Sequence, residues 1–179
     1  MTSHTAAGVQ QNKQARNPEI WVEAMYAVMS VHGLVRLADG LRLPLEHDES
    51  TRTPLVSIPE HADGNAVLND VAEFFGLEKA PRVFRAMARR PLYLKTTWSF
   101  VRQTLEADLL SREQKTLLAV AVSAAAGSDY GTDFFGAEAR RLDVDEEAVW
   151  ETLCVVQRFA GLTKFASGLD LEPDIFPKW

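Results

Sequence analysis

The strongest constraint on the fold is a series of helix start and stop signals that runs through most of the 179-residue chain. Asn17 followed by Pro18 is typical of a helix start, Pro91 restarts a helix, and Ser111 with Gln114 forms a capping box. Apolar residues between these signals recur at three- and four-residue spacing, without strand-like alternation in the second half. The sequence therefore predicts an all-α fold, with helices at 17–40, 66–76, 80–90, 91–107, 112–127 and 146–168.

Two regions differ from this helical pattern. Residues 1–16 are polar and predict a tail, while residues 17–179 predict a single domain. Residues 41–65 are rich in Pro, Asp, Glu, Ser and Thr and predict a long loop, which contains His61. Asp143 with Glu146 is the start signal expected for the last helix.

The composition narrows the classes of partner. The formal net charge is -6, so we expect no general attraction to nucleic acid or to an anionic membrane surface. The amino-terminal residues contain no apolar leader core, and no window approaches eighteen unbroken apolar residues, so the sequence predicts a cytoplasmic protein. Small molecules and other proteins remain as partners.

The sequence also predicts the burial of several individual side chains. Cys154 lies in a largely apolar run and is expected to be a buried, inert thiol, and His32 is expected to be a buried, hydrogen-bonded residue. The tryptophans on helical stripes are expected to be core or interface anchors: Trp21, Trp98 and Trp150.

The order of helices between residues 66 and 170 resembles the alkylhydroperoxidase D and carboxymuconolactone decarboxylase superfamily, most closely its peroxidase-related branch. The resemblance rests on a helix ending in Arg-Pro, the run "LSREQKTLLAVAVSAAAG", the short motif "GSDYGTDFFG" and the run "RRLDVDEEAV". It implies a two-layer, multi-helix bundle with an extra amino-terminal helix, assembled as a homo-trimer or homo-hexamer. The active site would lie at the start of the helix that follows the buried one.

The chain departs from the family at every redox position. Peroxidase members carry two cysteines separated by two residues, a histidine four after the second and a glutamate twelve before the first; here these are Ser128, Gly131, Phe135 and Thr116. A serine hydroxyl offers no sulfenate or disulfide chemistry, and glycine offers no resolving group. The sequence therefore predicts no thiol peroxidase activity and no cofactor, and the four residues would line the family pocket if it persists.

Other polar groups near this motif are weaker candidates. Asp129 and Asp133 lie one helical turn apart and, with Tyr130, could supply an acid or base; capping of the helix start is the alternative for the first-turn Asp and Ser residues. Spacing alone supplies no further ligands, so no metal is predicted. One arginine row could bind an anion, or could be a solvated or interface face: Arg82, Arg85, Arg89 and Arg90.

Two functions stay open from the sequence. One is a non-catalytic protein that binds a small ligand or acts as an accessory protein. The other is a cofactor-free decarboxylase, isomerase or hydrolase acting on a small organic acid. An open pocket containing Asp133 or Tyr130 would favour the enzyme, whereas filling by Phe134 and Phe135 would favour the non-catalytic protein.

Overall fold

The computed structural model describes residues 17–47, 52–59 and 65–171, and these residues form helices and connecting loops without a strand. The predicted tail at 1–16 and His61 lie outside them. The all-α prediction is confirmed. The helices are α2 (Pro18–Gly40), α3 (Ala66–Phe75), α4 (Arg82–Met87), α5 (Pro91–Leu105), α6 (Arg112–Ala125), α7 (Asp129–Arg141) and α8 (Glu146–Gly168).

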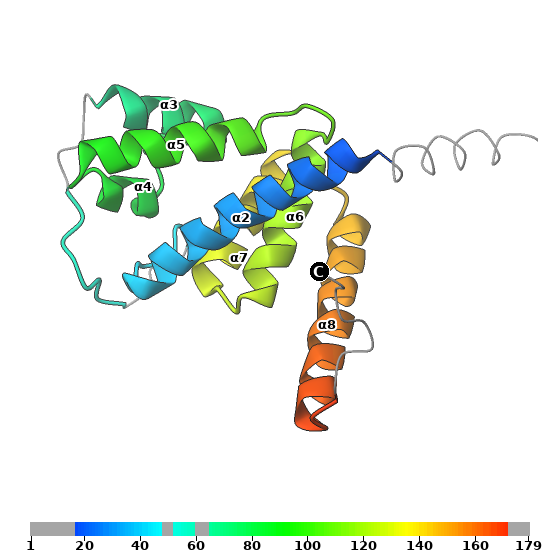
Figure 1. Cartoon of the computed structure of the whole chain (residues 1–179). Helices are drawn as coiled ribbons and strands as arrows, with labels where there is room; N and C mark the ends of the chain where they lie inside the picture. Colours follow the sequence, from blue (N-terminus) through cyan, green and yellow to red (C-terminus); the bar gives the residue numbers. More distant parts are fainter. Residues whose placement is uncertain (1–16, 48–51, 60–64, 172–179) are drawn as a thin grey trace, which may run out of the picture.

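Helix α6 is the centre of the arrangement, because it contacts α2, α7 and α8. Figure 1 shows α2 crossing in front of α6 and α7, with α3, α4 and α5 grouped beside them. The described parts of the 41–65 segment contain no helix, as predicted, and connect α2 to this second group.

Most of the predicted helix starts are confirmed. The Asn17 side chain accepts a hydrogen bond from the Glu19 amide at 3.0 Å, and Ser111 and Gln114 form the complete capping box. The prediction for the last helix was wrong. Asp145 caps α8, whereas Asp143 adopts a left-handed backbone with φ 53° in the preceding turn.

The core joins the two groups of helices through aromatic rings. The rings of Phe75 in α3 and Phe134 in α7 lie 5.0 Å apart edge to face, and within the second group those of Phe84 and Trp98 lie 5.4 Å apart. Trp98 also donates a hydrogen bond from its ring nitrogen to Asp70 at 2.6 Å. The expectation that Trp98 is a core anchor is confirmed.

The prediction that His32 is buried was wrong, and Trp21 and Trp150 are not core anchors, which leaves the interface alternative as the prediction for these two tryptophans. His32 is exposed on α2, because the face that packs on α6 is formed by Ala27, Val31, Leu34, Val35 and Ala38 instead. Trp21 and Trp150 are 62% and 63% exposed, so neither is a core residue of this chain.

Helix α8 departs most from expectation. Val149 and Leu153 pack against the core near its start, after which the helix projects away from the body and contains no buried residue (Figure 1). Cys154 is therefore exposed, and the prediction of a buried thiol was wrong.

Buried charges tie the helices together. Lys115 of α6, 1% exposed, pairs with Glu23 of α2. Glu138 of α7 is buried and pairs with Arg112, whose guanidinium lies 3.7 Å from the centre of the Phe74 ring. Burial lowers the pKa of Arg112, although the Glu138 carboxylate opposes that change.

Of the helices in the described part of the chain, α2 alone is long and apolar enough to span a membrane by length and composition. Core helices of soluble proteins and signal sequences pass the same test, and the carboxy-terminal half of α2 is a core element here.

Candidate functional site

Helix α7 begins with the motif that resembles a redox site, and its serine is used for capping. Ser128 is 1% exposed, and its hydroxyl oxygen accepts a hydrogen bond from the Gly131 amide at 2.9 Å. This satisfies one of the free amides at the start of the helix. The capping interpretation of Ser128 is confirmed.

The interior around Gly131 is closely packed. A Cβ atom added there would lie 2.5 Å from the Ser123 hydroxyl oxygen and 2.7 Å from a methyl carbon of Val35. Thr116 and Phe135, the other two matched positions, are also buried. Neither of the two large surface grooves described below includes any of the four matched residues.

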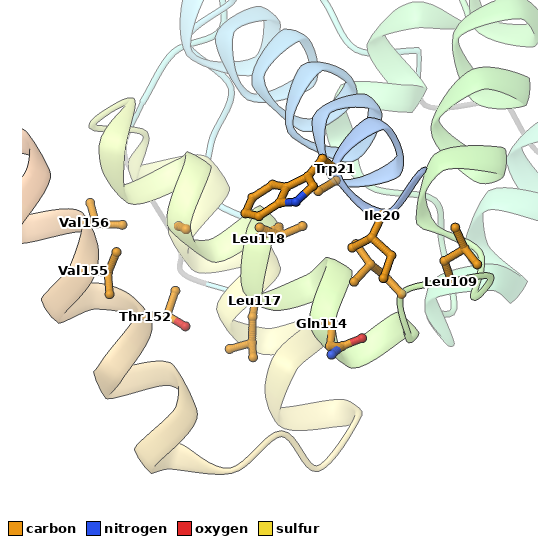
Figure 2. A pocket seen from close by; sticks show the side chains of 12 residues that line it. Ile20, Trp21, Leu109, Gln114, Leu117, Leu118, Thr152, Val155 and Val156 are labelled. Carbon is orange, nitrogen blue, oxygen red and sulfur yellow. The ribbon is translucent and has the colours of Figure 1, made fainter. Parts of the chain in front are cut away.

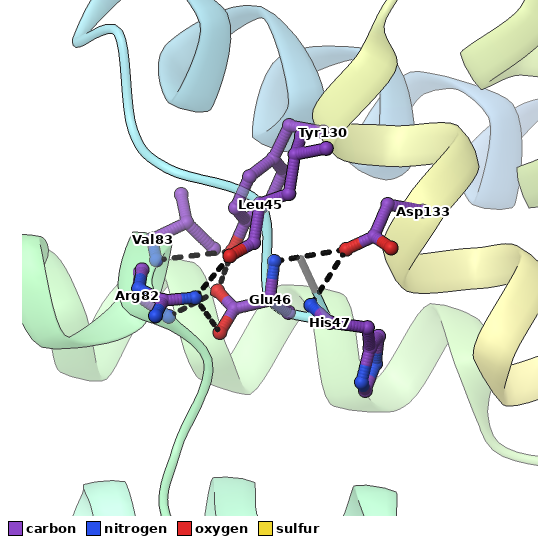
Figure 3. Close-up of polar contacts among 7 residues, drawn as sticks. All are labelled: Leu45, Glu46, His47, Arg82, Val83, Tyr130 and Asp133. Atoms are coloured by element: carbon purple, nitrogen blue, oxygen red, sulfur yellow. Dashed lines mark hydrogen bonds and ion pairs between the residues drawn. The ribbon is translucent and has the colours of Figure 1, made fainter. Parts of the chain in front are cut away.

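Tyr130 is buried on α7 and joins two distant segments. Its hydroxyl donates to the Glu46 carboxylate and accepts from the Val83 amide at 3.2 Å (Figure 3). Burial, reinforced by the negative charge of Glu46, raises the pKa of Tyr130 well above its ordinary value of 10.0. This phenol therefore keeps its proton at an alkaline pH at which an exposed tyrosine would ionise.

Asp133 is engaged by the same loop. Its carboxylate accepts hydrogen bonds from the backbone amides of Glu46 at 2.8 Å and His47 at 3.0 Å (Figure 3). The Glu46 carboxylate in turn pairs with Arg82 at 3.3 Å. Two of the three candidate acid-base residues thus fasten the loop that follows α2 onto α4 and α7. Arg82, one of the four arginines considered for anion binding, thus binds a carboxylate of its own chain.

Asp129, the third candidate, lies in a different environment. It is exposed, forms an ion pair with Arg52 and lines a pocket of about 270 Å³ at the start of α7. The other residues that line this pocket, the arginine pocket from here on, are Arg36, Asp39, Arg42, Arg52 and Gly127.

Backbone geometry shapes the arginine pocket on two sides. Arg42 follows the end of α2 with φ 56°, a left-handed conformation that is uncommon for residues other than glycine. Gly127 turns the chain between α6 and α7 with φ 64°. The pocket thus combines the end of α2, the α6–α7 turn and the 41–65 segment. Sequence analysis missed it because no periodic pattern relates these segments.

One carboxylate oxygen at this pocket has no hydrogen-bond partner among the residues that the structure describes. An oxygen of the Asp39 carboxylate is buried and accepts no hydrogen bond from the described residues. Because protein atoms enclose this oxygen, a molecule bound in the pocket would contact the exposed carboxylate of Asp129 rather than this atom.

Two larger grooves flank the amino-terminal half of α2. One, of about 520 Å³, lies between α2, α6 and α8 and is mainly apolar, with Trp21, Leu117, Leu118 and Val155 in its walls (Figure 2). The other, of about 580 Å³, includes Lys115 and Glu23. Within the described residues, no group of three or more His, Cys, Asp or Glu side chains is placed to hold a metal ion.

Comparison of this chain with protein-family models, with curated proteins and with solved structures found no match.

Proposed function

We propose that this chain is a non-catalytic protein that binds a small organic acid in the arginine pocket. The observation that carries the proposal is that three arginines, Arg36, Arg42 and Arg52, line one small cavity. Two carboxylates share the cavity, so it carries one net positive charge in a chain whose formal charge is -6. A carboxylate is the planar partner that a guanidinium binds through two parallel hydrogen bonds.

The two carboxylates that line the pocket, those of Asp39 and Asp129, refine the class of ligand. A molecule that carries a carboxylate and a hydrogen-bond donor could contact an arginine and one of these carboxylates together. A hydroxyl group next to the carboxylate meets both requirements. We therefore propose 2-hydroxy acids as the preferred ligands over acids that lack the hydroxyl.

The proposal includes a family relationship. The order of helices supports an alkylhydroperoxidase D-like, two-layer bundle in which the redox groups have been replaced. The buried cap at Ser128 and the close packing at Gly131 support a structural role for the former redox motif. Burial of Phe134 and Phe135 also favours the non-catalytic function over the enzyme.

A cofactor-free enzyme acting on a small organic acid is the second candidate, and Asp129 is the observation in its favour. Asp129 alone of the three acid-base candidates borders the arginine pocket, where it could take or give a proton. Turnover of a bound acid that is lost in Asp129→Asn, with binding retained, would select this alternative.

Isothermal titration tests the binding proposal with glycolate and acetate, which differ by one hydroxyl group. We expect glycolate to bind more tightly than acetate, and Arg36→Gln to weaken glycolate binding about tenfold or more, because a hydrogen bond to a charged group contributes about 1.5–3 kcal/mol. Arg90→Gln is the matched control, since Arg90 is exposed and outside the pocket. No heat of binding for either acid, or equal weakening by both variants, would refute the proposal.

A further inference from the structure

The second half of α8 presents large apolar side chains to solvent. Val155, Phe159, Leu162, Phe165 and Leu169 are each between 55% and 65% exposed. Between residues 155 and 169 the helix contains only two charged residues, Arg158 and Lys164. An isolated helix of this length is marginal in water without a packed face. Such a surface marks a contact with another molecule.

The apolar residues follow a coiled-coil spacing. Val155, Phe159, Leu162, Ala166 and Leu169 are separated by four, three, four and three residues, which places them on one seam. The seam is continuous with the apolar groove, because Val155 also lines that groove. A helix laid along the seam would therefore extend the packing already formed by α2, α6 and α8.

We infer that this seam is covered by α8 of a second copy of the chain, in antiparallel orientation about a two-fold axis at Leu162. With the axis at Leu162, Phe159 of one copy lies opposite Phe165 of the other, and Ala166 follows one residue, about 1.5 Å, further along the helix. The large ring of Phe159 thus packs beside a small side chain twice. Leu162 then meets Leu162 of the other copy at the axis. Parallel pairing would instead set Phe159 against Phe159 and leave a gap between the two Ala166 side chains.

The flanking residues fit the same arrangement. Arg158 of one copy lies opposite Ala166 of the other and one residue from Phe165, where its guanidinium can reach the ring. Five partly exposed side chains from each copy, on the order of 100 Å² apiece, would remove about 1,000 Å² from water, the lower bound for a specific interface. A two-fold contact also fits a hexamer of paired trimers, and it excludes a plain trimer.

Disulfide crosslinking tests the orientation, in the full chain with Cys154→Ser to remove the native thiol. Leu162→Cys should crosslink two copies, because both residues lie at the axis. Ala166→Cys should not, because the two positions would lie about 12 Å apart along the helices, beyond the reach of a disulfide. Gln157→Cys, on the opposite face, is the control. Crosslinking of Ala166→Cys, or none by Leu162→Cys, would overturn the inference.

Sedimentation velocity tests the contact itself. The wild-type chain should form a dimer or a larger even-numbered assembly, and Leu162→Glu should lower the subunit number twofold while Gln157→Glu leaves it unchanged. A monomeric wild type would show that a segment of the same chain or a different protein covers the seam, and would overturn the inference. Circular dichroism checks that each variant is folded. The arginine pocket contains no residue of α8, so Leu162→Glu should bind glycolate as tightly as the wild type. Loss of the two-fold contact and loss of acid binding can therefore be told apart.

Discussion

The hydroxyl of Tyr130 donates a hydrogen bond to the carboxylate of Glu46, a residue 84 positions earlier in the chain. Together with the bonds from the Glu46 and His47 amides to Asp133, it fastens the start of the 41–65 segment to α7. The motif that resembles a redox site thus holds the loop that follows α2 against α7 in this chain. The arginine pocket lies beside these contacts.

Removing the Tyr130 hydroxyl should destabilise the fold. Tyr130→Phe leaves the Val83 amide and the Glu46 carboxylate without this partner in a buried setting, which we expect to lower the free energy of unfolding by about 1–3 kcal/mol. Tyr93→Phe, at an exposed tyrosine of α5, should change it little. Urea denaturation of both variants measures the difference, and equal stability of both variants would contradict the role given to Tyr130.

The same tyrosine should make the protein sensitive to alkali. Because the folded pKa of Tyr130 is raised above 10.0, the folded chain keeps a proton that the unfolded chain releases as the pH rises past that value. Its contribution to stability is therefore complete below about pH 10 and is lost at higher pH. Denaturation midpoints measured from pH 8 to 11 should fall more steeply for the wild type than for Tyr130→Phe; parallel curves would count against this.

Gly131 should tolerate no side chain. Gly131→Ala places a methyl group within 2.5 Å of the Ser123 hydroxyl oxygen, and overpacking of this kind costs about 1–3 kcal/mol. Gly33→Ala is the matched control, because nothing lies within 4 Å of its added Cβ atom, and it should stabilise α2 by about 0.5–1 kcal/mol. Thermal unfolding should shift in opposite directions for the two variants, and a stabilised Gly131→Ala would show that the interior can yield.

Replacing Arg42 with glycine should raise the stability of the fold and weaken the binding of glycolate. Its left-handed backbone is strained for a residue with a side chain, so Arg42→Gly should raise the free energy of unfolding by about 1 kcal/mol. The same variant removes one guanidinium from the arginine pocket and should weaken glycolate binding. Unfolding and titration measured on one sample test both effects. Unchanged glycolate affinity would remove Arg42 from the site.

The helices could be predicted because their signals are local. The cap at Ser111 and the proline at Pro91 act within one turn, and both occur where the sequence indicates. The exposure of α8 could not be predicted. An apolar stripe indicates that residues such as Phe159 pack against something, but it does not indicate whether the partner is the same chain or another molecule. The same stripe led to the wrong expectation for Cys154.

The candidate site was predicted only in part. Asp129 was found from the motif, but the arginines that surround it come from segments with no common pattern. Tyr130 and Asp133 were expected as acid-base candidates, and the structure shows them in contacts with a loop residue, Glu46, that no periodicity pointed to. Contacts that span 84 residues depend on tertiary packing, which no short window of sequence contains.

A crystal structure of the wild-type chain grown with glycolate tests the central claim most directly. We predict a glycolate carboxylate about 2.7–2.9 Å from the guanidinium nitrogens of at least two of Arg36, Arg42 and Arg52, with its hydroxyl directed at the carboxylate of Asp129 or Asp39. Glycolate bound only in the apolar groove, or an arginine pocket without glycolate at saturating concentration, would contradict the account.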